Sequence, residues 1–300
     1  MPKETINHST DTKTIIDDID VICVQVVADI IALAFQSTFV SNESNGVNLL
    51  LIANAESAKT TIAHKFVDLP FVTYYDDVSQ KSIVDDFLPS VRHNNKKTLI
   101  IPDLVNSVEK QKVTRSGLLN MLKSGIDDTG ITELNSFHMK LERMNDFKGT
   151  KFNLVTAITS KALIQGSHLN LSLKKIMINS GLMTRFLPFS YNYPPSVKQK
   201  IKNVLFGGDS DPKDIVKFVD INQRMTYVES NPMLLQQFDG LANEINADME
   251  FSGYGFRALT LLRRLAKANA LLNHRTELEQ ADIDRIMHLG RFMNFKCGDI

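Results

Sequence analysis

The sequence contains little cysteine and no excess of charge of either sign. Its 300 residues include two cysteines, Cys23 and Cys297, which lie far apart, suit a reducing compartment and lack metal-ligand spacing. Lysine plus arginine and aspartate plus glutamate both total 34, so the formal net charge is zero. Nucleic-acid-binding domains are usually basic. This composition therefore indicates no such partner, although it does not exclude a local basic strip.

Long apolar runs are also absent. The closest approach to a membrane-spanning length, residues 21–40, is interrupted by Gln25, Asp29 and Gln36. The first residues are polar and acidic, unlike those of a secretory signal peptide. The hydrophobic content of 43% is sufficient for one large domain or two modest ones. We therefore expect a soluble, cytoplasmic protein without a membrane partner.

The sequence is instead rich in short apolar runs that alternate with helical patterns. Runs of the buried-strand type occupy residues 47–53, 71–75, 97–104 and 152–159, and residues 187–193 are a candidate for a fifth. Strands that alternate with helices indicate an α/β fold with a parallel sheet flanked by helices. Helical spacing of apolar residues also precedes the first run and fills the chain after residue 231.

These patterns divide the chain into four parts. Residues 1–45 are expected to form an N-terminal tail and a helix over residues 14–39. Residues 46–195 form an α/β core, and residues 196–222 form a linker that contains the loop-like "FGGDSDPKD". Residues 223–300 form an all-helical domain.

A phosphate-binding loop with altered glycines follows the first apolar run. "ANAESAKTT" matches the pattern G-x-x-x-x-G-K-[ST] with alanine at both glycine positions. In such a loop the backbone N–H groups surround the phosphates, Lys59 would reach the β- and γ-phosphates, and the Thr60 hydroxyl would bind Mg²⁺. The candidate nucleotide-binding residues are Ala53, Asn54, Ala55, Glu56, Ser57, Ala58, Lys59, Thr60 and Thr61.

The two alanines leave two interpretations of this loop open. Alanine carries a Cβ and disfavours a positive φ by about 1–2 kcal/mol, so a nucleotide would bind weakly or only in an assembly. The competing interpretation is an ordinary strand, turn and helix that contains a lysine by chance. The apolar strand before the loop and the helical pattern after it, with Ile62 and Phe66, favour phosphate binding.

Two later apolar runs end in residues that suit a nucleotide hydrolase. In "TLIIPDL", Asp103 would support the Mg²⁺ water shell, or it would orient the attacking water if Pro102 replaces the metal-shell acid. Leu104 follows, so the usual acidic pair is incomplete and slow or conditional hydrolysis is expected. "FNLVTAITS" offers Thr159 or Thr156 to the γ-phosphate, although threonine is ordinary in strands.

The order of these segments resembles that of an AAA+ ATPase. "ANAESAKTT", "TLIIPDL", "FNLVTAITS", "SGLMTRFLPF" and "GFRALTLLRRLAKANALL" stand where that family carries Walker A, Walker B, sensor 1, the arginine finger and sensor 2. The last two are most similar to the helicase branch that contains the minichromosome maintenance proteins. The resemblance covers roughly residues 46–295 and rests on order and spacing more than on identity. It suggests a phage or mobile-element replication protein.

The resemblance implies an AAA+ core with a C-terminal helical lid that binds ATP and Mg²⁺ and assembles into a ring or hexamer. Arg185 would be the finger that acts on the neighbouring subunit's nucleotide, and Arg257 would act from the lid. The implied function is an ATPase of DNA replication, a helicase or a helicase loader, with DNA and other replication proteins as partners. The alternative is a non-hydrolysing assembly or remodelling factor with a degenerate site.

A β-hairpin is expected just before the run at residues 152–159. "SFHMKLERMNDFKGTKFNLV" alternates apolar and polar residues around the turn-like "NDFKG". The resemblance implies that such a hairpin projects into the ring's pore, where Lys140, Arg143, Lys148 and Lys151 are candidate contacts to DNA phosphates. The alternative is a solvated surface hairpin.

Overall fold

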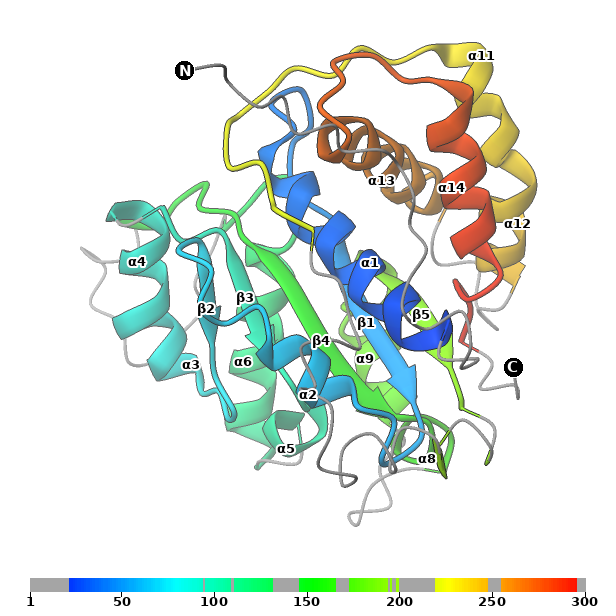
Figure 1. The fold of residues 1–300 in the computed structure, drawn as a ribbon. Coiled ribbons are helices and arrows are strands. Elements are labelled where there is room, and N and C mark those ends of the chain that lie inside the picture. The colour runs from blue at the N-terminus through cyan, green and yellow to red at the C-terminus, as the bar shows by residue number, and fades with distance from the viewer. Residues whose placement is uncertain are drawn as a thin grey trace, which may run out of the picture.

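The fold is built around a five-stranded parallel sheet with the strand order β2-β3-β4-β1-β5 (Figure 1). The computed structural model describes residues 22–93, 95–108, 111–131, 146–165, 173–193, 195, 198–199, 219–247 and 255–295. The strands are β1 (Asn48–Ala53), β2 (Val72–Tyr74), β3 (Thr98–Ile101), β4 (Asn153–Thr159) and β5 (Phe186–Tyr191). Every apolar run that predicts a strand contains one, so the predicted parallel α/β fold is confirmed.

Helices connect and cover the strands. Those before β5 are α1 (Ile22–Gln36), η1 (Ser37–Phe39), α2 (Lys59–His64), α3 (Gln80–Ser82), η2 (Ile83–Phe87), α4 (Leu88–His93), α5 (Leu104–Val108), α6 (Lys112–Gly125), α8 (Ser160–Gln165), α9 (Leu173–Asn179) and η3 (Met183–Arg185). Those after β5 are α11 (Pro232–Leu235), η5 (Gln236–Phe238), α12 (Asp239–Ala247), α13 (Arg257–Leu272) and α14 (Gln280–Gly290).

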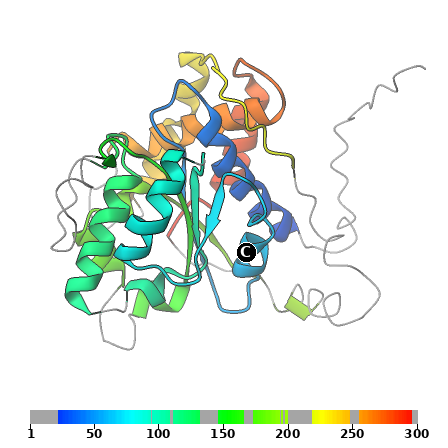
Figure 2. The ribbon, with the colours of Figure 1, turned by 90° about the vertical axis from the view of Figure 1, so that its left-hand side faces the viewer.

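Both faces of the sheet are covered, as the nearly continuous apolar character of its strands requires. Helices α1 and α2 lie on one face, and α6 and α9 lie on the other (Figures 1 and 2). All six residues of β1 are buried, and so are all six residues of β5. A parallel sheet of this kind presents its carboxyl-end loops to ligands at one edge.

The pairing register brings three strand ends together at that edge. Strand β4 lies between β1 and β3. Ala53 at the end of β1 pairs with Thr159 at the end of β4, and Ile101 at the end of β3 pairs with Thr156. Asp103 follows Ile101 by two residues, which is about one strand repeat, so it lies close to the level of Thr159.

Helix α1 joins the sheet to the C-terminal helices. It packs against β1 and β4 on one side and against α13 on the other. Val27, Ile30, Ile31 and Phe35 are fully buried along it. Because α1 is apolar on several faces, a single hydrophobic cluster runs from the sheet through α1 into α13 and α14.

The end of the expected linker and the residues after it lie along the end of α1 and the loop that follows α1. Asn222 exchanges two hydrogen bonds with the Gln36 side chain, and Thr226 bonds to the backbone of Phe39 and Ser41. Residues 201–218 of the expected linker lie outside the described residues. The tie between Gln36 and Asn222 places the following helices beside α1.

A buried glutamate in the same loop fixes α13. The side chain of Glu43 is 2% exposed and pairs with Arg263 at 2.8 Å, Lys267 at 2.7 Å and Arg264 at 3.3 Å. Arg264 also pairs with Asp128 at 2.7 Å. One carboxylate thus holds three cations of one helix, and this network joins α13 to the amino-terminal side of β1.

The expected hairpin lies mostly outside the described residues, and so do Lys140 and Arg143. In "NDFKG", Asp146 is helical and residues 147–149 form a turn, so the described residues just before β4 do not form a strand of the expected hairpin. Ile131 is hydrogen-bonded to both Gly149 and Thr150. Of the helices in the described part of the chain, none is both long and apolar enough to span a bilayer.

Replacing Glu43 with glutamine should lower the free energy of unfolding by about 3–5 kcal/mol near neutral pH, because three cations then lose a buried counter-charge. Glu244→Gln, at an exposed position of α12, is the matched control. Urea denaturation measures both variants. Wild-type stability in Glu43→Gln would contradict a structural role for the network.

The same glutamate should make stability depend on acid pH. Burial raises the pKa of Glu43, but hydrogen bonds and charges from Arg263 and Lys267 outweigh burial and hold the pKa below 4.5. The unfolded chain therefore takes up this proton more readily. The stabilisation is present above pH 4.5 and is lost as the pH falls through the lower folded pKa. In Glu43→Gln this part of the pH dependence should disappear.

Candidate functional site

The loop between β1 and α2 contains residues with positive φ, a conformation that alanine disfavours. Glu56 and Ala58 have positive φ angles of 61° and 57°. Ala53 ends β1 and is not among the residues with positive φ. Only the second alanine is therefore in the left-handed region, at a cost of about 1–2 kcal/mol relative to glycine.

The ammonium of Lys59 folds back into the concave side of this loop. Its Nζ donates to the carbonyl oxygens of Ala53 at 3.0 Å and Asn54 at 2.7 Å, and it lies 3.1 Å from the Ser57 hydroxyl. The ammonium group is thus held by polar atoms of its own loop.

Side chains from the neighbouring strand brace the loop. The Ser57 hydroxyl donates to the Asn54 carbonyl at 2.6 Å, and the Tyr191 hydroxyl donates to the Ser57 carbonyl at 3.2 Å. The Asn54 amide donates to Asn192 at 2.9 Å. These bonds tie the loop to the carboxyl end of β5, which lies beside β1. The loop shape is therefore held by tertiary contacts as well as by its own sequence.

Asp103 and Thr159 lie at the same edge of the sheet, and each caps a helix. Asp103 Oδ1 accepts a hydrogen bond from the Val105 N–H at 2.9 Å, and Thr159 Oγ1 accepts one from the Ala162 N–H at 3.3 Å. Thr156, the other threonine, is buried and donates to the Ile101 carbonyl at 2.8 Å. Thr159 is therefore the better placed of the two to meet a ligand.

Thr60 and Thr61 are the second and third residues of α2, and both are exposed. Helix α2 has six residues, so a helix dipole contributes little here, and the loop amides and Lys59 carry the positive potential. Ser160, which the sequence did not single out, is 5% exposed, and its hydroxyl has no hydrogen-bond partner within the described structure. Its position directly after Thr159 is the signal that could have identified it.

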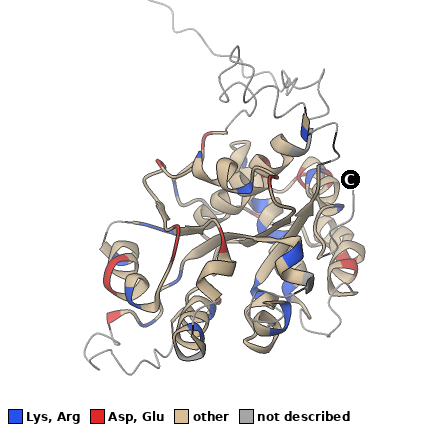
Figure 3. Cartoon of the chain, turned by 90° about the horizontal axis from the view of Figure 1, so that it is seen from below, with Lys and Arg blue, Asp and Glu red and all other residues tan. Residues whose placement is uncertain are grey.

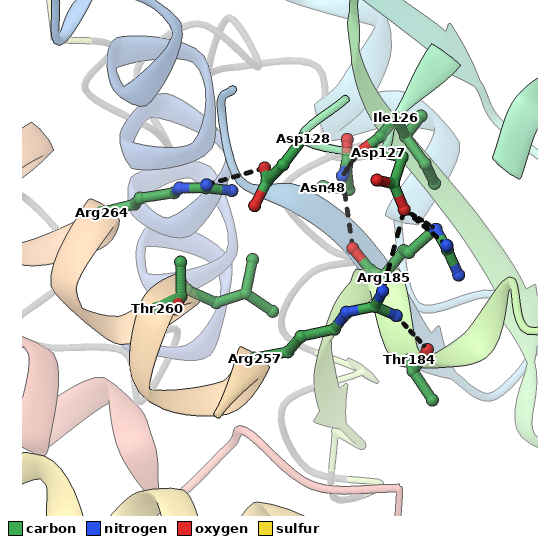
Figure 4. Close-up of a pocket in the computed structure, with 10 residues that line it drawn as sticks. Asn48, Ile126, Asp127, Asp128, Thr184, Arg185, Arg257, Thr260 and Arg264 are labelled. Carbon is green, nitrogen blue, oxygen red and sulfur yellow. Dashed lines mark hydrogen bonds and ion pairs between the residues drawn. The ribbon is translucent and has the colours of Figure 1, made fainter. Parts of the chain in front are cut away.

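Arg185 and Arg257 lie together, but at the opposite edge of the sheet (Figure 4). Arg185 directly precedes β5, whose first residue pairs with Asn48 at the start of β1. The loop of residues 53–61 follows the other end of β1. A six-residue strand separates the two edges by about 20 Å, so neither guanidinium reaches the loop of its own chain in this conformation.

Asp127 holds the two arginines side by side. Arg185 pairs with its Oδ2 at 2.5 Å, and Arg257 lies 3.8 Å from the same oxygen while donating to the Thr184 hydroxyl at 2.8 Å. Burial raises the pKa of Asp127, but the charge of Arg185 and hydrogen bonds from Thr129 outweigh burial and lower the pKa. The carboxylate therefore stays charged and keeps both guanidinium groups in place.

This cluster borders a narrow cavity of about 60 Å³, which is far smaller than a nucleotide site. Arg257 remains 46% exposed, whereas Arg185 is 14% exposed. The sequence did not indicate Asp127. Its partners, Arg185 and Arg257, are distant in the chain, and nothing near Asp127 in the sequence marks it as their partner. The contact exists only because α6 ends beside the start of β5.

Basic residues are distributed over several elements in the view of Figure 3, as expected for a neutral chain. Lys148 is exposed, and Lys151 is half-buried with its Nζ donating to the Ser44 carbonyl at 3.1 Å. Within the described residues, no group of three His, Cys, Asp or Glu side chains is arranged to bind a metal ion.

No protein-family model and no curated protein matches the sequence. The site is therefore interpreted from its own geometry.

Replacing Ala58 with glycine should raise the free energy of unfolding by about 1 kcal/mol, because the positive φ at this position strains alanine. Ala55→Gly is the matched control in the same loop. Ala55 is exposed and is not among the residues with positive φ, so glycine there should destabilise by about 0.5–1 kcal/mol. Thermal denaturation measures both variants. Equal effects would contradict the left-handed conformation of Ala58.

Proposed function

We propose that the chain binds ATP and Mg²⁺ at the loop of residues 53–61. The observation that carries this proposal is the position of the Lys59 ammonium, which is held on the concave side of the loop by the carbonyls of Ala53 and Asn54. Phosphate oxygens are charged acceptors and form stronger bonds with an ammonium group than neutral carbonyls do. An incoming phosphate would therefore replace these contacts favourably.

The residues at the carboxyl edge divide the remaining tasks. Thr60 and Asp103 would hold Mg²⁺, which typically uses one or two protein oxygens together with phosphates and waters. Such a site needs no cluster of three protein ligands. When bound, Mg²⁺ neutralises negative charge on the phosphates. Thr159 would contact the terminal phosphate, and Asp103 is held in a fixed orientation by its bond to Val105.

The placement of Arg185 and Arg257 supports action between subunits. Both lie at the edge opposite to their own phosphate loop and share Asp127 as a partner. In a head-to-tail assembly this edge of one subunit would face the loop of the next, and such contacts close into rings. We infer that both arginines stabilise charge on the neighbour's nucleotide.

These features together favour an AAA+ ATPase of the helicase branch, with residues 223–300 as the helical lid. The corresponding role is in DNA replication, as a helicase or a helicase loader that works as an oligomeric ring. This assignment rests on the resemblance of the five segments and on the common edge shared by Lys59, Asp103 and Thr159.

A second candidate function is a non-hydrolysing assembly factor, in which nucleotide only holds subunits together. The residues that flank Asp103 favour it. Its two neighbours in the chain are Pro102 and Leu104, so Asp103 has no adjacent carboxylate to share the metal and water roles. The strain at Ala58 would also weaken nucleotide binding. The two candidates differ in turnover rather than in ATP binding.

ATP with Mg²⁺ should raise the melting temperature of the wild-type protein. At 100 times the dissociation constant, ligand binding adds about 2.7 kcal/mol to the stability of the folded state. Lys59→Ala should abolish this shift, and Lys65→Ala, at an exposed position beyond α2, should retain it. A shift that persists in Lys59→Ala would contradict the proposed site.

Steady-state ATP hydrolysis, with and without single-stranded DNA, then separates the two candidates. Turnover that disappears in Lys59→Ala supports the ATPase, and binding without turnover supports the assembly factor.

Mixing two inactive variants tests action between subunits. Lys59→Ala and Arg185→Ala should each lose hydrolysis alone. Their equal mixture should recover about a quarter of the wild-type rate if subunits mix at random in a head-to-tail ring. Adding the double variant instead of Arg185→Ala is the control and should restore nothing. Wild-type hydrolysis by Arg185→Ala alone would show that this arginine is not the finger. The mass of the protein in solution, with and without ATP and Mg²⁺, reports the assembly itself.

A further inference from the structure

A second cavity lies at the amino edge of the sheet, away from the phosphate loop. Its volume is about 270 Å³. It is bordered by the loop after α1, the connection from α4 to β3, and the residues just before β4. Three lysines line it: Lys96, Lys97 and Lys151.

Within the described part of the chain, these lysines contact neutral groups. Lys96 Nζ donates to the Val72 carbonyl at 2.7 Å, and Lys151 Nζ donates to the Ser44 carbonyl at 3.1 Å. Lys97 Nζ lies 3.0 Å from the Met225 sulfur and 4.7 Å from the centre of the Phe39 ring. An ammonium group has three donors, and each of these hydrogen bonds uses one of them.

The acid that lines the cavity does not balance this charge. Among the described residues that line the cavity, Glu43 is the only Asp or Glu. Its carboxylate is 2% exposed and already bound by Arg263, Arg264 and Lys267. Burial also lowers the pKa of Lys97. The described residues that line the cavity therefore carry an excess of positive charge.

We propose that this cavity binds a phosphate group. Lysine ammonium groups bind phosphate as point charges. Three lysine residues line this space, which is slightly smaller than typical pockets for small molecules of about 300–1,000 Å³. The phosphate belongs either to a nucleic-acid backbone or to a small phosphorylated compound. The site is distinct from the Lys59 loop, because Lys97 and Lys151 precede their strands whereas that loop follows β1.

Binding is tested in the full chain carrying Lys59→Ala, so that the phosphate loop contributes nothing and the outcome does not depend on the proposed ATPase. Inorganic phosphate is titrated by calorimetry, and a fluorescent single-stranded oligodeoxythymidine is titrated by anisotropy at several salt concentrations. Lys97→Gln and Lys151→Gln are the cavity variants. Lys81→Gln removes an exposed lysine of α3 that does not line the cavity and is the matched control.

Each cavity variant should weaken phosphate binding about tenfold or more, as expected for the loss of a charged hydrogen bond, and the control should not. If the oligonucleotide also binds, its salt dependence should fall by about one counterion per lysine removed, which identifies the nucleic-acid source. Phosphate binding without oligonucleotide binding identifies a small compound.

The proposal is overturned if phosphate does not bind, or if the cavity variants bind it as tightly as Lys81→Gln does. Thermal denaturation checks that Lys97→Gln folds. Lys151→Gln keeps the test decisive if it does not, because the Lys151 ammonium donates to a loop carbonyl, that of Ser44.

Discussion

The parallel pairing of β1 with β4 is the constraint on which the rest of the structure depends. Buried asparagines fix its register. Asn48 Oδ1 accepts from the Leu154 N–H at 2.9 Å, and the Asn153 amide donates to the Val47 carbonyl. The Asn48 amide also donates to the carbonyls of Ile126 and Arg185. A slip of one residue would leave these buried polar groups unpaired, at a cost of about 1–3 kcal/mol each. The same register aligns Ala53 with Thr159 and so creates the edge at which Lys59 and Asp103 lie.

The two edges of the sheet differ in chemistry, and this difference organises the proposed function. The carboxyl edge carries a lysine held by neutral carbonyls, one carboxylate after β3 and small hydroxyl side chains. The amino edge carries arginines, acids and lysines, including the Asp127 cluster, the Glu43 network and the phosphate cavity. Because a rigid strand of about 20 Å separates the edges, groups on one edge cannot serve the other within a single chain. In the proposed function, contact between subunits combines them.

Helix α1 and the Glu43 network determine where the C-terminal helices lie. The apolar faces of α1 contact the sheet and α13, while Glu43 pairs with three cations of α13, of which Arg264 and Lys267 are buried. Removing one partner of such a network is costly, so α13 stays beside the start of β1. This position brings Arg257 next to Arg185. A movement of α13 relative to the sheet would have to break the bonds to Glu43 and Asp127 together.

The sequence by itself determined the fold class, the order of strands and helices along the chain, and the position of the loop around Lys59. These follow from apolar periodicity and turn composition, which are local properties of the chain. It did not determine that, of the two alanines at the glycine positions, Ala58 has a positive φ and Ala53 does not. It also did not determine that the Thr156 hydroxyl donates to the Ile101 carbonyl. Nor did it determine that Asp127 joins Arg185 to Arg257. Nor did it show that Lys96, Lys97 and Lys151 line one cavity. These features depend on strand order and helix packing, which bring together residues that are distant in the chain and that no local pattern relates.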